Sequence, residues 1–158
     1  MGLRTEVQAI YLNGLGIKVY RAAAADPQNA WQTIFTITGG LVLLTNLIGV
    51  RTVIQAGGAS TMQFRHSVGP TILDAGTLAI TGHAVGTIYL LDGDFADPIL
   101  SGVAGVAIET SNKYAGIFGA GIVLGAGTIQ VTMTAVAGTG STRYLCTYIP
   151  FDQGASIT

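Results

Sequence analysis

Short runs of β-branched and aromatic residues, separated by glycine and other turn-forming residues, make up most of this 158-residue chain. Val, Ile, Thr, Tyr and Phe favour strands, whereas Gly, Asn, Asp and Pro favour the turns between them. Helical periodicity of apolar residues is hard to find. The pattern predicts an all-β chain, and about ten strands indicate a single β-sandwich or jelly-roll-like domain.

The clearest predicted strand is Gly127–Val136, in which apolar and polar residues alternate. Successive side chains of a strand point to opposite faces, so the apolar set is expected to face the core. The polar set is expected to form a half-solvated or interface-facing surface, and its members are Thr128, Gln130, Thr132 and Thr134.

Two further strands are predicted from similar patterns. In Ala30–Thr38 the Trp31, Phe35 and Ile37 side chains are expected to point inward. Thr142–Pro150 is apolar on both faces, which predicts a central strand covered on both sides. Weaker strand candidates are Glu6–Leu12, Gly16–Arg21, Leu41–Leu44, Gly49–Gln55, Thr61–Ser67, Thr77–Thr81, Thr87–Leu91 and Tyr114–Leu124.

The strongest break in the chain lies near Asp26-Pro27. Ala22–Ala25 directly before it has high helix propensity, which predicts a turn or a single helical turn there. The break divides the chain into an N-terminal arm or edge hairpin, 1–28, and a β-sandwich domain, 29–158.

Charged residues are scarce: the chain has 7 Lys or Arg and 8 Asp or Glu, while 49% of its residues are hydrophobic. A typical soluble domain carries about 25% charged residues. Charge is depleted where a surface is permanently covered, because desolvating an ion costs more than pairing it returns. We therefore expect a homo-oligomer, with a trimer favoured.

The same composition argues against two classes of partner. The seven basic residues are scattered along the chain, and the net charge is −1, so a nucleic-acid-binding surface is not expected. The most apolar windows, Gly39–Val50 and Ala115–Gly127, fall short of the ~20 residues that a membrane helix needs. No membrane partner is expected either.

No recognisable catalytic constellation is present in the sequence. His66 and His83 are the only imidazoles, and the Gly-x-Ser-x-Gly motif is absent. Cys146 is the only cysteine, which excludes an internal disulfide and favours a small buried side chain. The glycine pairs match no phosphate-binding loop. We expect no enzyme activity and no cofactor.

Three acidic residues in one loop, Asp92, Asp94 and Asp97, form the best metal-like cluster. Carboxylates on a flexible turn could hold Ca²⁺. The alternative is a solvated loop in which Asp-Gly and Asp-Pro supply the turn geometry, and this interpretation is favoured. No metal is expected as a resident ligand.

Two aromatic residues, Trp31 and Tyr114, join the polar set of Gly127–Val136 as interface candidates. Aromatic side chains dominate the energetics of cores and interfaces, and subunit contact is the expected role. The alternative is that Trp31 or Tyr114 stacks on a sugar while the aspartate loop binds calcium, as in a lectin-like jelly roll.

From about Gln28 to Gly154 the chain resembles small β-sandwich structural proteins of tailed bacteriophages, of the head-decoration or minor virion kind. The segments that bear this resemblance are Asn29–Gly40, Ala84–Tyr89, Gly125–Gln130 and Tyr144–Asp152. The resemblance implies a non-enzymatic protein of the virion that binds the major capsid protein and stabilises the shell. A tail or fibre component is the alternative, because similar sandwiches occur there.

Overall fold

The computed structural model describes residues 16–54, 58–69, 71–73, 77–91, 100–102, 121–134 and 140–158. Every regular element among them is a strand, so the described part of the chain is all-β, as predicted. The strands are β1 (Ile17–Ala25), β2 (Gln32–Thr38), β3 (Val42–Val53), β4 (Thr61–His66), β5 (Thr71–Ile72), β6 (Leu78–Ala79), β7 (Ile88–Leu91), β8 (Leu100–Gly102), β9 (Ile122–Leu124), β10 (Gly127–Thr134), β11 (Ser141–Pro150) and β12 (Ser156–Ile157).

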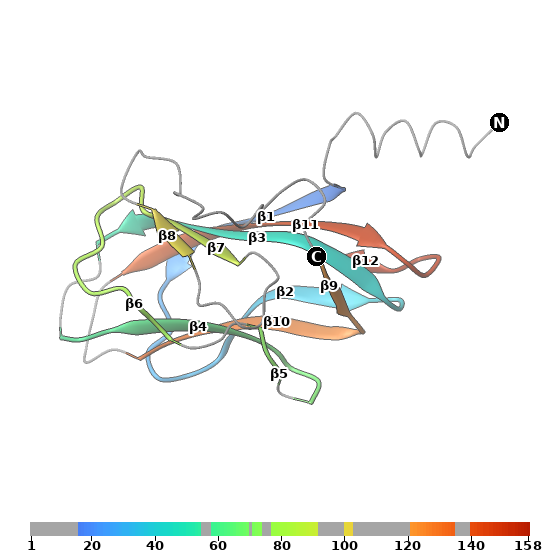
Figure 1. Ribbon diagram of the computed structural model, residues 1–158, viewed down its shortest axis with the longest axis horizontal. Coiled ribbons are helices and arrows are strands. Elements are labelled where there is room, and N and C mark those ends of the chain that lie inside the picture. The colour runs from blue at the N-terminus through green and yellow to red at the C-terminus, as the bar shows by residue number, and fades with distance from the viewer. Residues whose placement is uncertain are drawn as a thin grey trace.

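The strands form two sheets that lie as two layers (Figure 1). Sheet A has the order β1-β11-β3-β7-β8, with β9 also paired to β3. Sheet B has the order β12-β2-β10-β4-β5, with β6 also paired to β4. The pairings within both sheets are antiparallel. The predicted β-sandwich is confirmed.

One apolar core lies between the sheets. Phe64 of sheet B meets Tyr144 of sheet A edge to face, with ring centroids 6.2 Å apart. Such aromatic pairs add to the stabilisation from the area that they bury. The core residues that are essentially inaccessible to solvent are Val42, Leu47, Met62, Phe64, Leu73, Ile80, Tyr89, Ile129, Val131, Met133 and Cys146.

The alternation predicted for Gly127–Val136 is present in β10. Ile129, Val131 and Met133 are fully buried in the core, while the residues between them are half-buried or exposed. On the neighbouring strand, β4, the buried residues Phe64 and Met62 stand opposite Val131 and Met133. Period-two patterning therefore separates the inner face of sheet B from its outer face.

β3 joins two segments that the sequence suggested as separate strands, Leu41–Leu44 and Gly49–Gln55. Thr147 of β11 stands opposite Asn46, whereas Tyr148 stands opposite Leu44, so Thr45 is the extra residue of a β-bulge. The Thr45 hydroxyl donates to the Thr147 carbonyl at 3.0 Å. The polar residues that interrupt the apolar pattern mark a bulge and not the end of a strand.

A second bulge, in β2, corrects the expected orientation of Trp31. Ile129 of β10 stands opposite Phe35, but Gln130 stands opposite Thr33, which leaves Ile34 as the extra residue. Beyond a bulge the inward and outward positions exchange. Phe35 and Ile37 are buried, as predicted. The prediction that Trp31 points inward is wrong, because the bulge turns it to the outer face.

Arg21 of β1 satisfies the backbone that this bulge exposes. Its Nη1 atom donates to the carbonyl oxygens of Thr33 and Ile34, the latter at 3.0 Å. A bulge leaves carbonyls without partners in the ladder, and a charged donor compensates them well. The contact also joins the edge of sheet A to sheet B.

β1 runs through Ala25, so the turn or helical turn expected at Ala22–Ala25 is wrong. Pairing with β11 overrides the helix propensity of alanine, since tertiary context outweighs local preference. Of the segment 1–28, expected as an arm or edge hairpin, residues 17–25 form this edge strand. Residues 1–15 lie outside the described part of the chain, as does the strand candidate Glu6–Leu12.

β11 lies between β1 and β3, in the central position predicted for Thr142–Pro150. Its inward residues Tyr144, Cys146 and Tyr148 are buried. The expectation that both faces are covered is wrong in part, because Leu145 is half-buried and Arg143 is exposed on the outer face.

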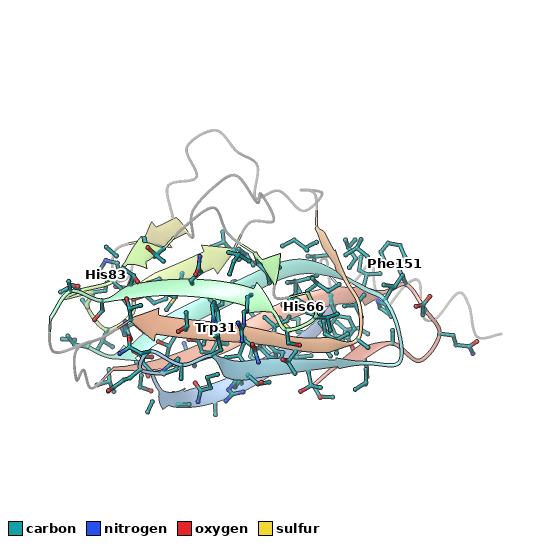
Figure 2. All side chains as sticks on the ribbon, turned by 90° about the horizontal axis from the view of Figure 1, so that it is seen from below. Trp31, His66, His83 and Phe151 are labelled. Atoms are coloured by element: carbon teal, nitrogen blue, oxygen red, sulfur yellow. The ribbon has the colours of Figure 1, made fainter. Side chains whose placement is uncertain are left out.

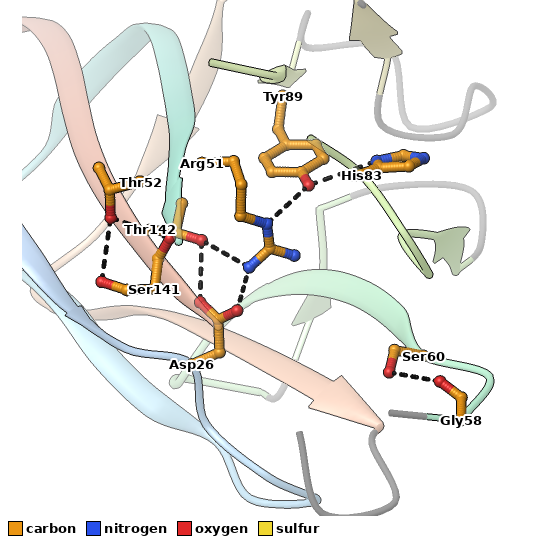
Figure 3. A network of polar contacts seen from close by, with 9 residues as sticks. All are labelled: Asp26, Arg51, Thr52, Gly58, Ser60, His83, Tyr89, Ser141 and Thr142. Atoms are coloured by element: carbon orange, nitrogen blue, oxygen red, sulfur yellow. Dashed lines mark hydrogen bonds and ion pairs between the residues drawn. The ribbon is translucent and has the colours of Figure 1, made fainter. Parts of the chain in front are cut away.

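A buried ion pair lies at the centre of a network of polar contacts (Figure 3). Arg51 of β3 donates to Asp26, which directly follows β1 in sequence, and the two side chains are 0% and 2% exposed. Thr142 of β11 donates to the other Asp26 oxygen at 2.8 Å, and Arg51 Nε donates to the Tyr89 hydroxyl at 3.2 Å. The network ties four parts of sheet A together.

Asp26→Ala is expected to destabilise the fold by about 3–5 kcal/mol, because it leaves the Arg51 guanidinium buried without its counter-ion. Urea unfolding followed by circular dichroism measures the loss. Arg143→Ala, which removes an exposed arginine from the same sheet, is the control and is expected to change little. Equal, small effects of both substitutions would contradict the role of the pair.

Candidate interaction surface

The outer face of sheet B collects side chains that are polar but almost all uncharged. Figure 2 shows the position of Trp31, one member of this face. The β10 residues of the face alternate with buried core residues, and the pairing with β4 and β2 extends the surface sideways. Arg65 is its single charged member. The surface, called here the threonine face, consists of Trp31, Thr33, Thr36, Thr61, Gln63, Arg65, Thr128, Gln130, Thr132 and Thr134.

Arg65 lies at the centre of the threonine face. Its guanidinium carbon is 4.1 Å from the centroid of the Trp31 ring, which is a cation–π contact. Arg65 Nε donates to Oε1 of Gln130, the residue directly opposite it, at 2.7 Å. The stacking and the hydrogen bond hold the side chains of Trp31, Arg65 and Gln130 together.

Hydroxyl groups are also held in place across neighbouring strands. The Thr61 and Thr134 hydroxyls lie 2.5 Å apart, and those of Thr38 and Ser156 lie 3.1 Å apart. The Thr128 amide donates to the Ser67 hydroxyl at 2.8 Å. A preorganised surface loses little side-chain entropy when a partner covers it.

The structure brings together the interface candidates that it describes. Trp31 joins Thr128, Gln130, Thr132 and Thr134 on one face of sheet B, and all are half-buried or exposed. Tyr114 lies outside the described residues. The sequence analysis did not identify Arg65 as a member of this face. Its position in Thr61–Ser67, between Phe64 and His66, indicates an outward side chain once those two neighbours are known to point inward.

One face of the Trp31 indole is covered by Arg65. The lectin-like alternative needs an aromatic ring that is open for a sugar to stack on, and on this face the guanidinium occupies that place. The calcium loop of that alternative, Asp92, Asp94 and Asp97, lies outside the described residues. Within the described part, no group of three His, Cys, Asp or Glu could hold a metal ion.

His66 is a core residue with a hydrogen-bond partner. It is 6% exposed, and its Nε2 lies 3.1 Å from the Gly125 carbonyl oxygen. It stands opposite Ile129 on the inner face of sheet B. These contacts explain the side chain without a catalytic role.

His83 belongs to the Asp26–Arg51 network. Its Nδ1 lies 3.3 Å from the Tyr89 hydroxyl, and the two rings stack with centroids 5.9 Å apart. Burial, and then the charge of Arg51, lower the pKa of His83 below its ordinary value of 6.5. The folded state therefore favours the neutral imidazole of His83 more than the unfolded chain does.

This lowered pKa predicts a loss of stability in acid that depends on His83. The unfolded chain binds the proton more readily, so the contribution is complete above pH 6.5 and is lost as the pH falls from there toward the folded pKa. Thermal melting of wild type and His83→Gln between about pH 7 and pH 5 measures it. The wild type is expected to lose more stability; parallel curves would refute this.

Cys146 is buried, as its sequence context suggested. Burial raises the pKa of its thiol to about 12, so the nucleophilic thiolate is not populated at neutral pH. The thiol therefore contributes packing. Separately, the described part of the chain contains no helix long and apolar enough to cross a membrane.

Comparisons with protein-family models, curated proteins and solved structures found no match to this chain. The bacteriophage family that the sequence resembles therefore stays a prediction.

Trp31 is the only tryptophan, so its fluorescence reports on the centre of the threonine face. Arg65→Ala is expected to expose the indole to water and shift its emission to longer wavelength, because the covering guanidinium is removed. Arg143→Ala, on the other sheet, serves as the control. An unchanged Arg65→Ala spectrum would show that the stack does not form in solution.

Proposed function

We propose that this chain is a non-enzymatic virion structural protein that attaches to the capsid shell of a tailed bacteriophage as a decoration protein. The observation that supports this most is the threonine face, a surface with one charged residue that unites Trp31 with the polar residues of β10. The resemblance of the sequence to head-decoration proteins adds to it.

The composition of this face suits burial against another protein. Threonine has short side chains that lose little rotamer freedom, so covering them costs less entropy than covering Lys or Glu. Protein interfaces are depleted of Lys and Glu at their centres and enriched in Trp and Arg. Trp31 and Arg65 are the members expected to contribute most of the binding energy.

A shell presents many identical sites, which relaxes the affinity needed at each. An oligomer that engages several sites at once gains avidity without new contacts, provided that its geometry matches the spacing. A homo-oligomer on a capsid lattice could therefore bind firmly even if each threonine face forms few hydrogen bonds with the shell. A tail or fibre location would use the same surface on a smaller number of sites.

Quantitative mass spectrometry of purified virions tests the location. A shell protein is expected at several hundred copies per particle, and electron microscopy should place it on the head; on the order of tens of copies would indicate a tail component. Absence of the chain from the particle would overturn the proposal.

Arg65→Glu is expected to reduce the copies per particle at least tenfold, because it breaks the contact with Trp31 and places a carboxylate at the centre of the face. Arg143→Glu makes the same charge change on the exposed outer face of sheet A and is expected to leave the copy number unchanged. Equal attachment of both variants would exclude the threonine face as the contact surface.

A further inference from the structure

β1 is the long open edge among the described strands. It stands at one end of sheet A with nine residues, and no described strand pairs with its second edge. The strands at the other sheet ends, β8, β5 and β12, have two or three residues. A long unpaired edge is a template for another strand, and proteins usually cover or block it.

The hydrogen bonds of sheet A show which groups of β1 are free for pairing. The Asp26 amide donates to the Gly140 carbonyl, so every second residue of β11 from Gly140 turns its backbone toward β1. The β1 residues opposite these positions are Ile17, Val19 and Arg21. Lys18 and Tyr20, between them, point their N–H and C=O groups away from the sheet.

The side chains of this edge are unusually open. Tyr20 is 73% exposed and Ile17 is 45% exposed. Tyr20 also borders a hollow of about 480 Å³ on the outer face of sheet A, whose lining includes Ala22, Ile48, Val50 and Leu145. Apolar surface beside a free edge favours an occupant that adds both a strand and side chains.

We propose that β1 pairs antiparallel with β1 of a second copy, about a twofold axis at Val19. This register sets Lys18 opposite Tyr20 of the second copy and Ile17 opposite Arg21. Lys18 and Tyr20 are the residues whose backbone groups point outward, so each such pair exchanges both of its hydrogen bonds. The two sheets A become one continuous sheet.

Charge and regularity select this register over its neighbours. An axis at Lys18 or at Arg21 places like charges directly opposite each other, which destabilises a strand pair. An axis at Tyr20 extends the pairing across the bulge between Arg21 and Ala24. Pairing about Val19 uses only the regular stretch Ile17–Arg21 and sets each Lys18 ammonium beside a Tyr20 ring.

This contact goes beyond the proposed function and leaves the threonine face of both copies free, since that face belongs to sheet B. It is a different arrangement from the threefold assembly expected from the sequence. A twofold contact gives a dimer and no larger assembly, because both subunits use the same surface patch for the contact.

The mass of the purified full chain in solution tests the pairing. Sedimentation over a dilution series is expected to give twice the 16.2 kDa chain mass at the higher concentrations. Tyr20→Lys places Lys18 opposite a lysine at both symmetric positions and is expected to give a single chain. Adding Lys18→Glu restores opposite charges and is expected to restore two copies.

Phe151→Lys is the matched control, because it changes an aromatic residue of 60% exposure that lies outside β1. It is expected to keep the wild-type mass. Circular dichroism melting checks that each variant folds. A single-chain or three-copy wild type would overturn the pairing, and so would a Tyr20→Lys variant that keeps two copies.

A cysteine cross-link tests the same register without relying on charge. In Lys18→Cys/Tyr20→Cys, each new thiol stands opposite its counterpart in the second copy, at a Cα separation of about 5.5 Å that a disulfide spans. Mild oxidation is expected to give a two-chain band on a non-reducing gel. Failure to cross-link in a folded variant would rule the register out, while leaving attachment through the threonine face untouched.

Discussion

The separation of two faces along β10 and β4 is the constraint on which the rest of the structure depends. Ile129, Val131 and Met133 point into the core. Because successive side chains of a strand point to opposite faces, the residues between them point to the outer face. A slip of one residue would bury the threonines and expose the core, so packing fixes the register. The same register that makes the core also assembles the threonine face.

Four charged residues of the described structure make specific contacts. Asp26 and Arg51 pair inside the sandwich, Arg21 binds the carbonyls of the β2 bulge, and Arg65 lies over Trp31. Each of these four has at least one polar or cation–π contact, although Nη2 of Arg51 is buried without a hydrogen-bond partner. Little charge remains on the outer face of sheet B, and this agrees with a surface that functions when covered.

Local pattern predicted most of the longer strands, but it predicted neither which strands pair nor the short strands β5, β8 and β12. The alternation over Gly127–Val136 and the apolar run Thr142–Pro150 predicted β10 and the central position of β11. Ala22–Ala25 was mistaken for a turn, because its strand conformation comes from pairing with a segment more than a hundred residues away. Bulges also escaped prediction, and one of them reversed Trp31.

The contacts across the sheets were beyond sequence reasoning for the same reason. The residues near Asp26 in sequence do not indicate that it pairs with Arg51, and those near Trp31 do not indicate that it contacts Arg65. Both pairs form because strands distant in sequence become neighbours. The polar residues of β10 could be predicted to share one face from the sequence of that strand alone. Arg65 could not be placed on this face in the same way, because it lies on β4.

Hydroxyl-radical footprinting of Trp31, in the free protein and in assembled virions, tests the central claim that the threonine face is covered in the particle. The account predicts that the half-buried indole is oxidised in the free chain and protected in the virion. Phe151, which is 60% exposed at the turn after β11, is the internal reference for radical dose. Equal oxidation of Trp31 in both states, with Phe151 unchanged, would contradict the account.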